Sequence, residues 1–403
     1  MRKWAIAGLA MQMALGLGAA HAADDEVKIG VMTDLSGPDS DMAGAGSVLA
    51  AQMAIEDAGG KVGNRKVVLI SADHQRKPDV ASSLATRWYD NDGVDVILDV
   101  PLSSAGLAVQ EIAKQRGKIA IFATSATSDL TGKACSPTGF HWVYDTKAVA
   151  NGTAAAVTKD GGKDWYFVTS DYAFGHAIER DATEVIEKNG GKVLGRVRHP
   201  VSNSDFSSFL MQAQASKANV IGLANSANDL TGALRQASEF GITQSGQKVA
   251  ALLAFITDVN SLGLPVAQGT YLTESFYWDL NDETRAWSER FAKRHNGVKP
   301  TMIQAGIYSA TSHYLKALAE SESKDGKVVA QKMRDIPVND FMTKNAQIWP
   351  SGWVNRDFYL FRVKSPEQSK GPWDYYELVA EIPAAVAKPE GSDDACALMH
   401  KAN

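Results

Sequence analysis

Cysteine is scarce in this sequence of 403 residues, which contains only Cys135 and Cys396. The two form no C-x-x-C motif and have no histidine cluster beside them, so they do not indicate a zinc site. Histidines are scattered, and none pair at the spacing of metal ligands on a helix. We therefore expect no metal site and interpret these histidines as surface or structural residues: His74, His141, His176, His199, His295 and His313.

Short enzyme motifs are also missing. The sequence contains no G-x-S-x-G, no H-E-x-x-H and no G-x-x-x-x-G-K-[ST]. Gly44 and Gly46 stand near an expected helix start, as in a dinucleotide-binding turn, but Leu49 occupies the place of the third glycine. We predict no catalytic residue and no cofactor.

After the N-terminus there is neither an excess of positive charge nor a long apolar run. The formal net charge is −5, and it becomes −7 without residues 1–22, which carry Arg2 and Lys3 but no acid. A mildly acidic chain argues against binding to nucleic acid or to an anionic membrane surface.

The first 22 residues have the features of a secretory signal. Arg2 and Lys3 precede an apolar stretch over residues 4–20, and Ala20-His21-Ala22 fits the cleavage pattern. A membrane anchor is the alternative, but the run is short and a cleavage site follows at once. We expect residues 1–22 to be a signal peptide and the mature protein to reach the periplasm, without lipid attachment because no cysteine follows the site.

An even cysteine count in an oxidising compartment favours one disulfide between Cys135 and Cys396. This bond would tie the C-terminal tail, residues 383–403, to a loop in the first third of the chain. Two separate thiols are the alternative.

Short β-rich runs alternate with helical patterns along the chain, which predicts an α/β fold with parallel sheets covered by helices on both faces. Helices are expected over 43–58, 78–91, 103–115, 281–296 and 300–321. Strands are expected over 27–33, 66–71, 94–100, 118–123, 165–169, 193–197, 219–224, 248–255, 358–363 and 375–381.

Two halves of the chain repeat one arrangement. VMTD (31–34) leads through a helix to AGGKV (58–62), and VTSD (168–171) leads through a helix to NGGKV (189–193). We therefore predict two Rossmann-like lobes joined by several short crossings. Lobe 1 comprises residues 24–143 and 276–336, and lobe 2 comprises residues 144–275 and 337–382.

Hydroxyl-rich turns follow two expected strands of lobe 1. Ser103 and Ser104 follow one strand, and Thr124 and Ser125 follow the next. Open α/β sheets bind ligands at the carboxyl ends of their strands, where helix N-termini favour an anion. A plain helix cap is an equally good interpretation of Ser103.

In lobe 2 the corresponding loops offer aromatic and amide groups rather than an acid–base pair. Packing within lobe 2 is an alternative role for the aromatic pair. The candidate binding residues here are Tyr172, Phe174, Asn225, Thr257 and Asp258.

Four stretches resemble the leucine/isoleucine/valine-binding family of periplasmic solute receptors: IGVMTDLSG (29–37), ATSATSDLTG (123–132), SDYAFGHA (170–177) and QAGIYSATSHYLKAL (304–318). The resemblance implies the type I periplasmic binding protein fold, with a hinge of several crossings. It also implies that Ser103 meets a ligand carboxylate, that Thr124 and Ser125 complete that site, and that Phe174 is an aromatic contact. Asn225 departs from the family pattern, which has an aromatic residue there.

The same resemblance leaves the ligand open. Amino-acid binders of the family carry an acid in the loop here written Phe255 to Asp258, and its position falls on Ile256 or Thr257, beside Asp258. If Asp258 turns inward, an amino acid fits; otherwise an acid without an amine fits better. ITDVNSLGL (256–264) and FYWDLNDETRAW (276–287) resemble the aromatic-acid-binding branch of the family.

We therefore expect a monomeric periplasmic solute-binding protein that closes its lobes around a small carboxylate and delivers it to an ABC permease. A ligand sensor for a membrane receptor has the same fold and cleft, and a secreted α/β enzyme is the third hypothesis.

Overall fold

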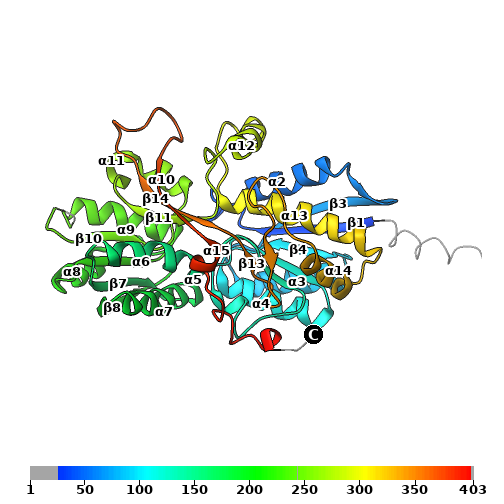
Figure 1. Ribbon diagram of the computed structural model, residues 1–403, viewed down its shortest axis with the longest axis horizontal. Helices are drawn as coiled ribbons and strands as arrows, with labels where there is room; N and C mark the ends of the chain where they lie inside the picture. The colour runs from blue at the N-terminus through cyan, green and yellow to red at the C-terminus, as the bar shows by residue number, and fades with distance from the viewer. Residues whose placement is uncertain (1–25, 243, 401–403) are drawn as a thin grey trace, which may run out of the picture.

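The computed structural model describes residues 26–242 and 244–400, and Figure 1 shows two α/β lobes side by side. The predicted signal peptide, residues 1–22, lies outside the described residues. The α/β architecture with parallel sheets flanked by helices is as predicted.

The first lobe is built on a six-stranded sheet that is parallel except at β2. Its strands, in spatial order, are β2 (Lys61–Val62), β3 (Arg65–Asp73), β1 (Glu26–Thr33), β4 (Val96–Asp99), β5 (Ile119–Phe122) and β6 (Gly139–His141). Its helices are α2 (Gly44–Asp57), α3 (Pro78–Asp90), α4 (Ser103–Arg116), α12 (Asp282–Arg294), α13 (Met302–Ser321) and α14 (Gly326–Asp335).

Alternation along β1 explains why helices cover both faces of this sheet. Val27, Ile29 and Val31 belong to the core cluster that contains residues of α2 and α13. Met32 belongs to the cluster on the opposite face, formed with α3 and α4. Successive side chains of a strand point to opposite faces, so a strand buried on both sides is apolar throughout.

The second lobe has a four-stranded parallel sheet and a three-stranded antiparallel sheet. The first consists of β10 (Lys248–Ala251), β9 (Val220–Ala224), β7 (Asp164–Ser170) and β8 (Lys192–His199), and the second of β11 (Tyr271–Glu274), β14 (Phe358–Val363) and β15 (Tyr376–Ile382). The helices of this lobe are α6 (Ala155–Lys159), α7 (Ala173–Lys188), α8 (Ser207–Ala215), α9 (Ala227–Glu239), α10 (Ile256–Leu262) and α11 (Leu264–Ala267).

The strand expected over 248–255 is too long by four residues. It ends at Ala251, and Phe255 becomes the N-cap of α10. The Asp258 carboxylate accepts a hydrogen bond of 2.9 Å from the Phe255 N–H, so this backbone group is bonded to a side chain instead of a neighbouring strand.

Several crossings join the lobes. One runs through α5 (Thr146–Val149) and the π-helical turn Ala150–Ala154, a second leads from β11 to α12, and a third leads from α14 to β14. The third carries the short strands β12 (Gln347–Ile348) and β13 (Val354–Asn355). A β-bridge between His141 and Trp353 attaches part of the predicted lobe 2 segment 337–382 to the edge of the first sheet. The predicted lobe boundaries remain a prediction.

The C-terminal tail leads from β15 back to the first lobe, through α15 (Ala384–Ala387) to the 3-10 turn Ala397–His400 (Figure 1). Its end is joined to the first lobe by a disulfide between Cys135 and Cys396, the pairing that the cysteine count favours. Along the way Lys388 is buried between Asp145 and Asp393. Within the described part of the chain, no helix has the length and apolar character needed to cross a membrane.

Candidate functional site

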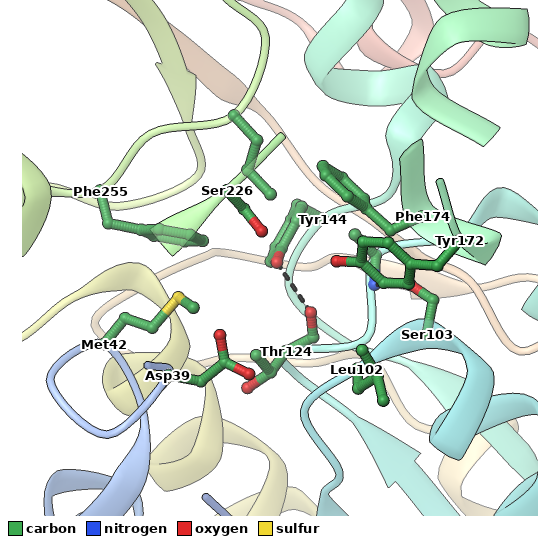
Figure 2. A pocket seen from close by; sticks show the side chains of 12 residues that line it. Asp39, Met42, Leu102, Ser103, Thr124, Tyr144, Tyr172, Phe174, Ser226 and Phe255 are labelled. Carbon is green, nitrogen blue, oxygen red and sulfur yellow. Dashed lines mark hydrogen bonds between the residues drawn. The ribbon is translucent and has the colours of Figure 1, made fainter. Parts of the chain in front are cut away.

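A small cavity lies between the lobes, and the empty space in it, including the part open to solvent, is about 290 Å³. The lining residues, most of them labelled in Figure 2, are Asp39, Met42, Leu102, Ser103, Thr124, Ala126, Tyr144, Tyr172, Phe174, Ser226, Leu253 and Phe255.

Helix starts from both lobes meet at this cavity. Ser103 begins α4 in the first lobe, whereas Tyr172, Ser226 and Phe255 are the N-caps of α7, α9 and α10 in the second lobe. Each helix start follows the carboxyl end of a parallel strand. Because helix N-termini present unpaired N–H groups and a partial positive charge, the cavity is suited to an anion.

Ser103 presents a hydroxyl donor to the cavity. Its Oγ accepts hydrogen bonds of 3.2 Å from the backbone N–H groups of Ala126 and Thr127. These contacts use the oxygen lone pairs and leave the hydroxyl proton to donate. The serine therefore both ties two loops together and presents a donor beside the α4 N-terminus.

The turn that presents Ser103 is strained. Asp99, Val100 and Leu102 have φ angles of 82°, 57° and 73°, in the left-handed region that favours glycine. Ser125 holds this turn, since its Oγ donates to the carbonyl oxygen of Val100 at 2.5 Å. Such strain persists only where surrounding contacts support it, and it is frequent at binding sites.

Thr124 lines the cavity but does not have a free proton to offer. Its hydroxyl donates to the buried Asp99 carboxylate, to which Thr33 also donates at 2.8 Å. Burial raises the pKa of Asp99 to about 6, and these hydrogen bonds limit the rise. At neutral pH the carboxylate accepts a hydrogen bond from each hydroxyl, so Thr124 presents only hydroxyl lone pairs to a ligand.

The predicted aromatic pair from lobe 2 also lines the cavity. The ring centroids of Tyr172 and Phe174 are 5.8 Å apart. Burial raises the pKa of Tyr172 to about 12, so the phenol is neutral at physiological pH. Tyr144, whose hydroxyl donates to the Thr124 carbonyl at 2.8 Å, adds a third ring (Figure 2).

The other predicted site residues do not line the cavity. Ser104 lies one residue beyond the lining serine, and Ser125 supports the turn behind it. Asn225 faces His199 instead, at 3.3 Å between Nδ2 and Nε2. Thr257 is on α10, outside the lining, and so is the carboxylate of Asp258.

The carboxylate of Asp258 does not turn inward. It accepts a hydrogen bond from the N–H of Phe255, the N-cap of α10, and burial raises its pKa to about 7. The acid that lines the cavity is Asp39, which was not among the residues predicted from the sequence. Other lining residues that were not predicted are Met42, Tyr144, Ser226, Leu253 and Phe255. A signal was present: Asp39 follows the first strand of the repeat, where the same rule about strand ends applies.

Three buried side chains, those of Ser170, His199 and Asp229, are of the residue types in a hydrolase catalytic triad, but they do not have its geometry. Ser170 Oγ lies 3.4 Å from His199 Nε2, but its contact with the acid Asp229 is direct, at 3.3 Å. His199 Nδ1 contacts the carbonyl oxygen of Pro200 at 2.8 Å, so no carboxylate orients the ring. None of these side chains lines the cavity. Within the described residues no group of three His, Cys, Asp or Glu side chains could hold a metal ion.

Comparisons with known proteins agree with this architecture. The model of the periplasmic binding protein family matches residues 26–372. A crystal structure of a periplasmic binding protein from Burkholderia mallei is 44% identical, with a TM-score of 0.91, covering 93% of this chain and 99% of that one.

Two further relatives have more specific descriptions. A branched chain amino acid ABC transporter periplasmic ligand-binding protein from Burkholderia xenovorans is 39% identical, with a TM-score of 0.83, covering 93% of this chain and 100% of that one. The Leu/Ile/Val-binding protein homolog 4 of Brucella abortus is 24% identical over 339 residues, which is 80% of this chain and 79% of its own.

Proposed function

The chain belongs to the periplasmic binding protein family, and from this premise we propose that it captures a small carboxylate between its lobes and delivers it to an ABC permease. The predicted signal over residues 1–22 would place it in the periplasm. The homologues are solute-binding proteins, a class that binds ligands without transforming them.

The observation that carries the proposal is the shared lining of one cavity. Ser103 and Thr124 come from the first lobe, whereas Tyr172, Phe174 and Ser226 come from the second. A ligand that touches both lobes favours the closed arrangement by its differential affinity for that state. Hinge closure around the ligand follows from this lining.

Within the cavity the two ends differ in chemistry. The carboxylate of the ligand is held by the Ser103 hydroxyl and the N-terminus of α4. The remainder of the ligand lies against the rings of Tyr144, Tyr172 and Phe174. A branched-chain amino acid and an aromatic acid both satisfy this pattern.

Isothermal titration calorimetry tests the carboxylate site. We expect binding by acids such as leucine or benzoate and not by leucinamide or benzamide. The Ser103→Ala variant is expected to lose about 1–3 kcal/mol of binding free energy, because a buried carboxylate loses its donor.

Ser104→Ala is the matched control, since this hydroxyl belongs to the next residue and does not line the cavity. It should bind as the wild-type protein does. Equal affinity of the Ser103→Ala variant, or equal binding of acid and amide, would remove the carboxylate site from the proposal.

A further inference from the structure

The cavity contains an acid that the carboxylate site does not use. Asp39 lies between β1 and α2, its side chain is 4% exposed, and it is among the lining residues. In Figure 2 its carboxylate points toward the space between the labelled side chains. A buried acid beside an anion site opposes the ligand carboxylate unless a positive charge compensates it, and Arg76 and an ammonium group of the ligand can both supply one.

Hydrogen bonds within the chain hold the loop around Asp39. Asp34 accepts hydrogen bonds from the backbone N–H groups of Gly37 at 2.8 Å and Asp39 at 3.0 Å. The Asp39 carbonyl then accepts from Ala43, immediately before α2. The carboxylate is therefore held in place by its own backbone.

Arg76 pairs with only one oxygen of this acid. Its guanidinium donates to Asp39 Oδ1 at 2.5 Å, and the guanidinium side chain is 13% exposed. Arg76 also interacts electrostatically with Tyr172 and Asp229 of the second lobe, so Asp39 is not the only group that its positive charge acts on. None of the hydrogen bonds found among the described residues uses Asp39 Oδ2.

Aromatic side chains line the same cavity as this acid. Tyr144, Tyr172 and Phe255 line the same cavity, and Met42 lies on the same loop as the acid. A carboxylate oxygen beside aromatic faces is a good environment for an ammonium group, which the ring quadrupoles also attract. The acid expected in this role from the second lobe, Asp258, is occupied by its helix cap.

We propose that Asp39 is the ammonium-binding residue of the cavity, so that the preferred ligand is an amino carboxylate whose ammonium contacts the first lobe. This inference rests on the proposed function, because it takes Ser103 and the α4 N-terminus as the site of the ligand carboxylate. It assigns both charged groups of the ligand to one lobe and leaves the side chain of the ligand to the aromatic residues.

Matched ligand pairs measured by calorimetry test the assignment. Leucine is compared with 4-methylpentanoate, and phenylalanine with 3-phenylpropanoate, because each pair differs only in the amino group. We expect the amino acid of at least one pair to bind about 10- to 100-fold more tightly than its partner, the range for a charged hydrogen bond.

Asp39→Asn is the decisive variant, since it keeps the shape of the side chain and removes its charge. It should abolish most of the preference within each pair and leave the deaminated acid bound at least as tightly as before. Asp41→Asn is the matched control, an exposed acid two positions further along the same loop, and should keep the preference. Melting temperatures of both variants confirm that they are folded.

The pH dependence gives a second readout. Burial raises the pKa of Asp39 to about 6, although Arg76 opposes the rise and Asp34 and Asp99 add to it. Between about pH 7.5 and pH 5.5, protonation should weaken binding of the amino acid and strengthen binding of its deaminated partner. The other titratable groups that act on this site are Asp258, Tyr144 and Tyr172, and comparison with Asp39→Asn isolates the part that Asp39 contributes.

The outcomes separate this inference from the proposed function. If deaminated acids bind as tightly as amino acids, or if Asp39→Asn keeps the preference, the assignment of Asp39 is wrong while the carboxylate site stands. If no acid of either kind binds, or if Ser103→Ala has no effect on those that do, the proposed function fails, and the inference fails with it.

Discussion

Replacing Lys388 by methionine should destabilise the protein more than any exposed substitution. The Lys388 ammonium is 1% exposed and lies 2.5 Å from Asp145 and 2.7 Å from Asp393, both of which are fully buried. It also donates to Thr131 at 2.8 Å and sits 4.2 Å above the ring of Trp353. Methionine keeps the length and apolar stem of the side chain but leaves two buried carboxylates without their cation.

Removing one partner of a buried ion pair typically costs about 3–5 kcal/mol. We expect a loss of this size in the free energy of unfolding at pH 7, measured by urea denaturation. The matched control is Lys344→Met, whose pair with Glu283 is exposed, at 60% and 57%. That variant should lose about 0–1 kcal/mol, because exposed ion pairs contribute little.

The destabilisation should shrink as the pH falls. Burial tends to raise the pKa of Asp145, but the attraction of Lys388 and His141 and the hydrogen bonds from Lys388 and Ala148 together outweigh it, so the folded pKa lies below its usual value. This acid therefore stabilises the wild-type fold above its unfolded pKa, and the contribution is lost as pH falls through the folded value. Without the lysine, burial alone raises the pKa, and protonation relieves the variant. A loss below about 1 kcal/mol at pH 7, or one that does not depend on pH, would refute the reasoning.

Two further substitutions test other parts of the structure. The double variant Cys135→Ser, Cys396→Ser opens a loop with a sequence separation of 261 residues. Chain entropy sets an upper limit of about 5 kcal/mol on the lost stability. An unchanged denaturation midpoint would contradict a stabilising role for the disulfide. Thr124→Val removes a hydrogen-bond donor from the buried Asp99. The free energy of unfolding should therefore fall by about 1–3 kcal/mol in the same urea assay. An unchanged value would show that this hydrogen bond contributes nothing.

Much of the fold could be predicted because its physical causes are local. The run from Val27 to Thr33 is mostly apolar, with Lys28 and Thr33 as its polar residues, and Pro78 and Ser103 begin their helices where expected. The strand expected over 248–255 was wrong, since its composition resembles a strand throughout. The strand ends at Ala251, and the last expected residue, Phe255, is instead the N-cap of α10, with its N–H bonded to the carboxylate of Asp258.

The site was harder to predict because a residue lines the cavity only if its side chain points into it, and the sequence does not give that direction. Ser103, Thr124, Tyr172 and Phe174, chosen as ligand-binding residues from their places after strand ends, line the cavity, and their contact with a ligand stays a prediction. Asn225 occupies an equivalent place after β9 but points to His199 at the end of β8, which lies on the other side of β7 in the same sheet. Sequence position determines which loop a residue belongs to, whereas the hydrogen-bond partner that folding brings to it determines where it points.

A crystal structure of the protein with its bound acid tests the central claim most directly. The account predicts that the ligand carboxylate lies within hydrogen-bond distance of Ser103 Oγ and the first N–H groups of α4, while Tyr172 or Phe174 of the second lobe contacts the rest of the same molecule. A ligand bound to one lobe only, or with its carboxylate away from Ser103, would contradict it.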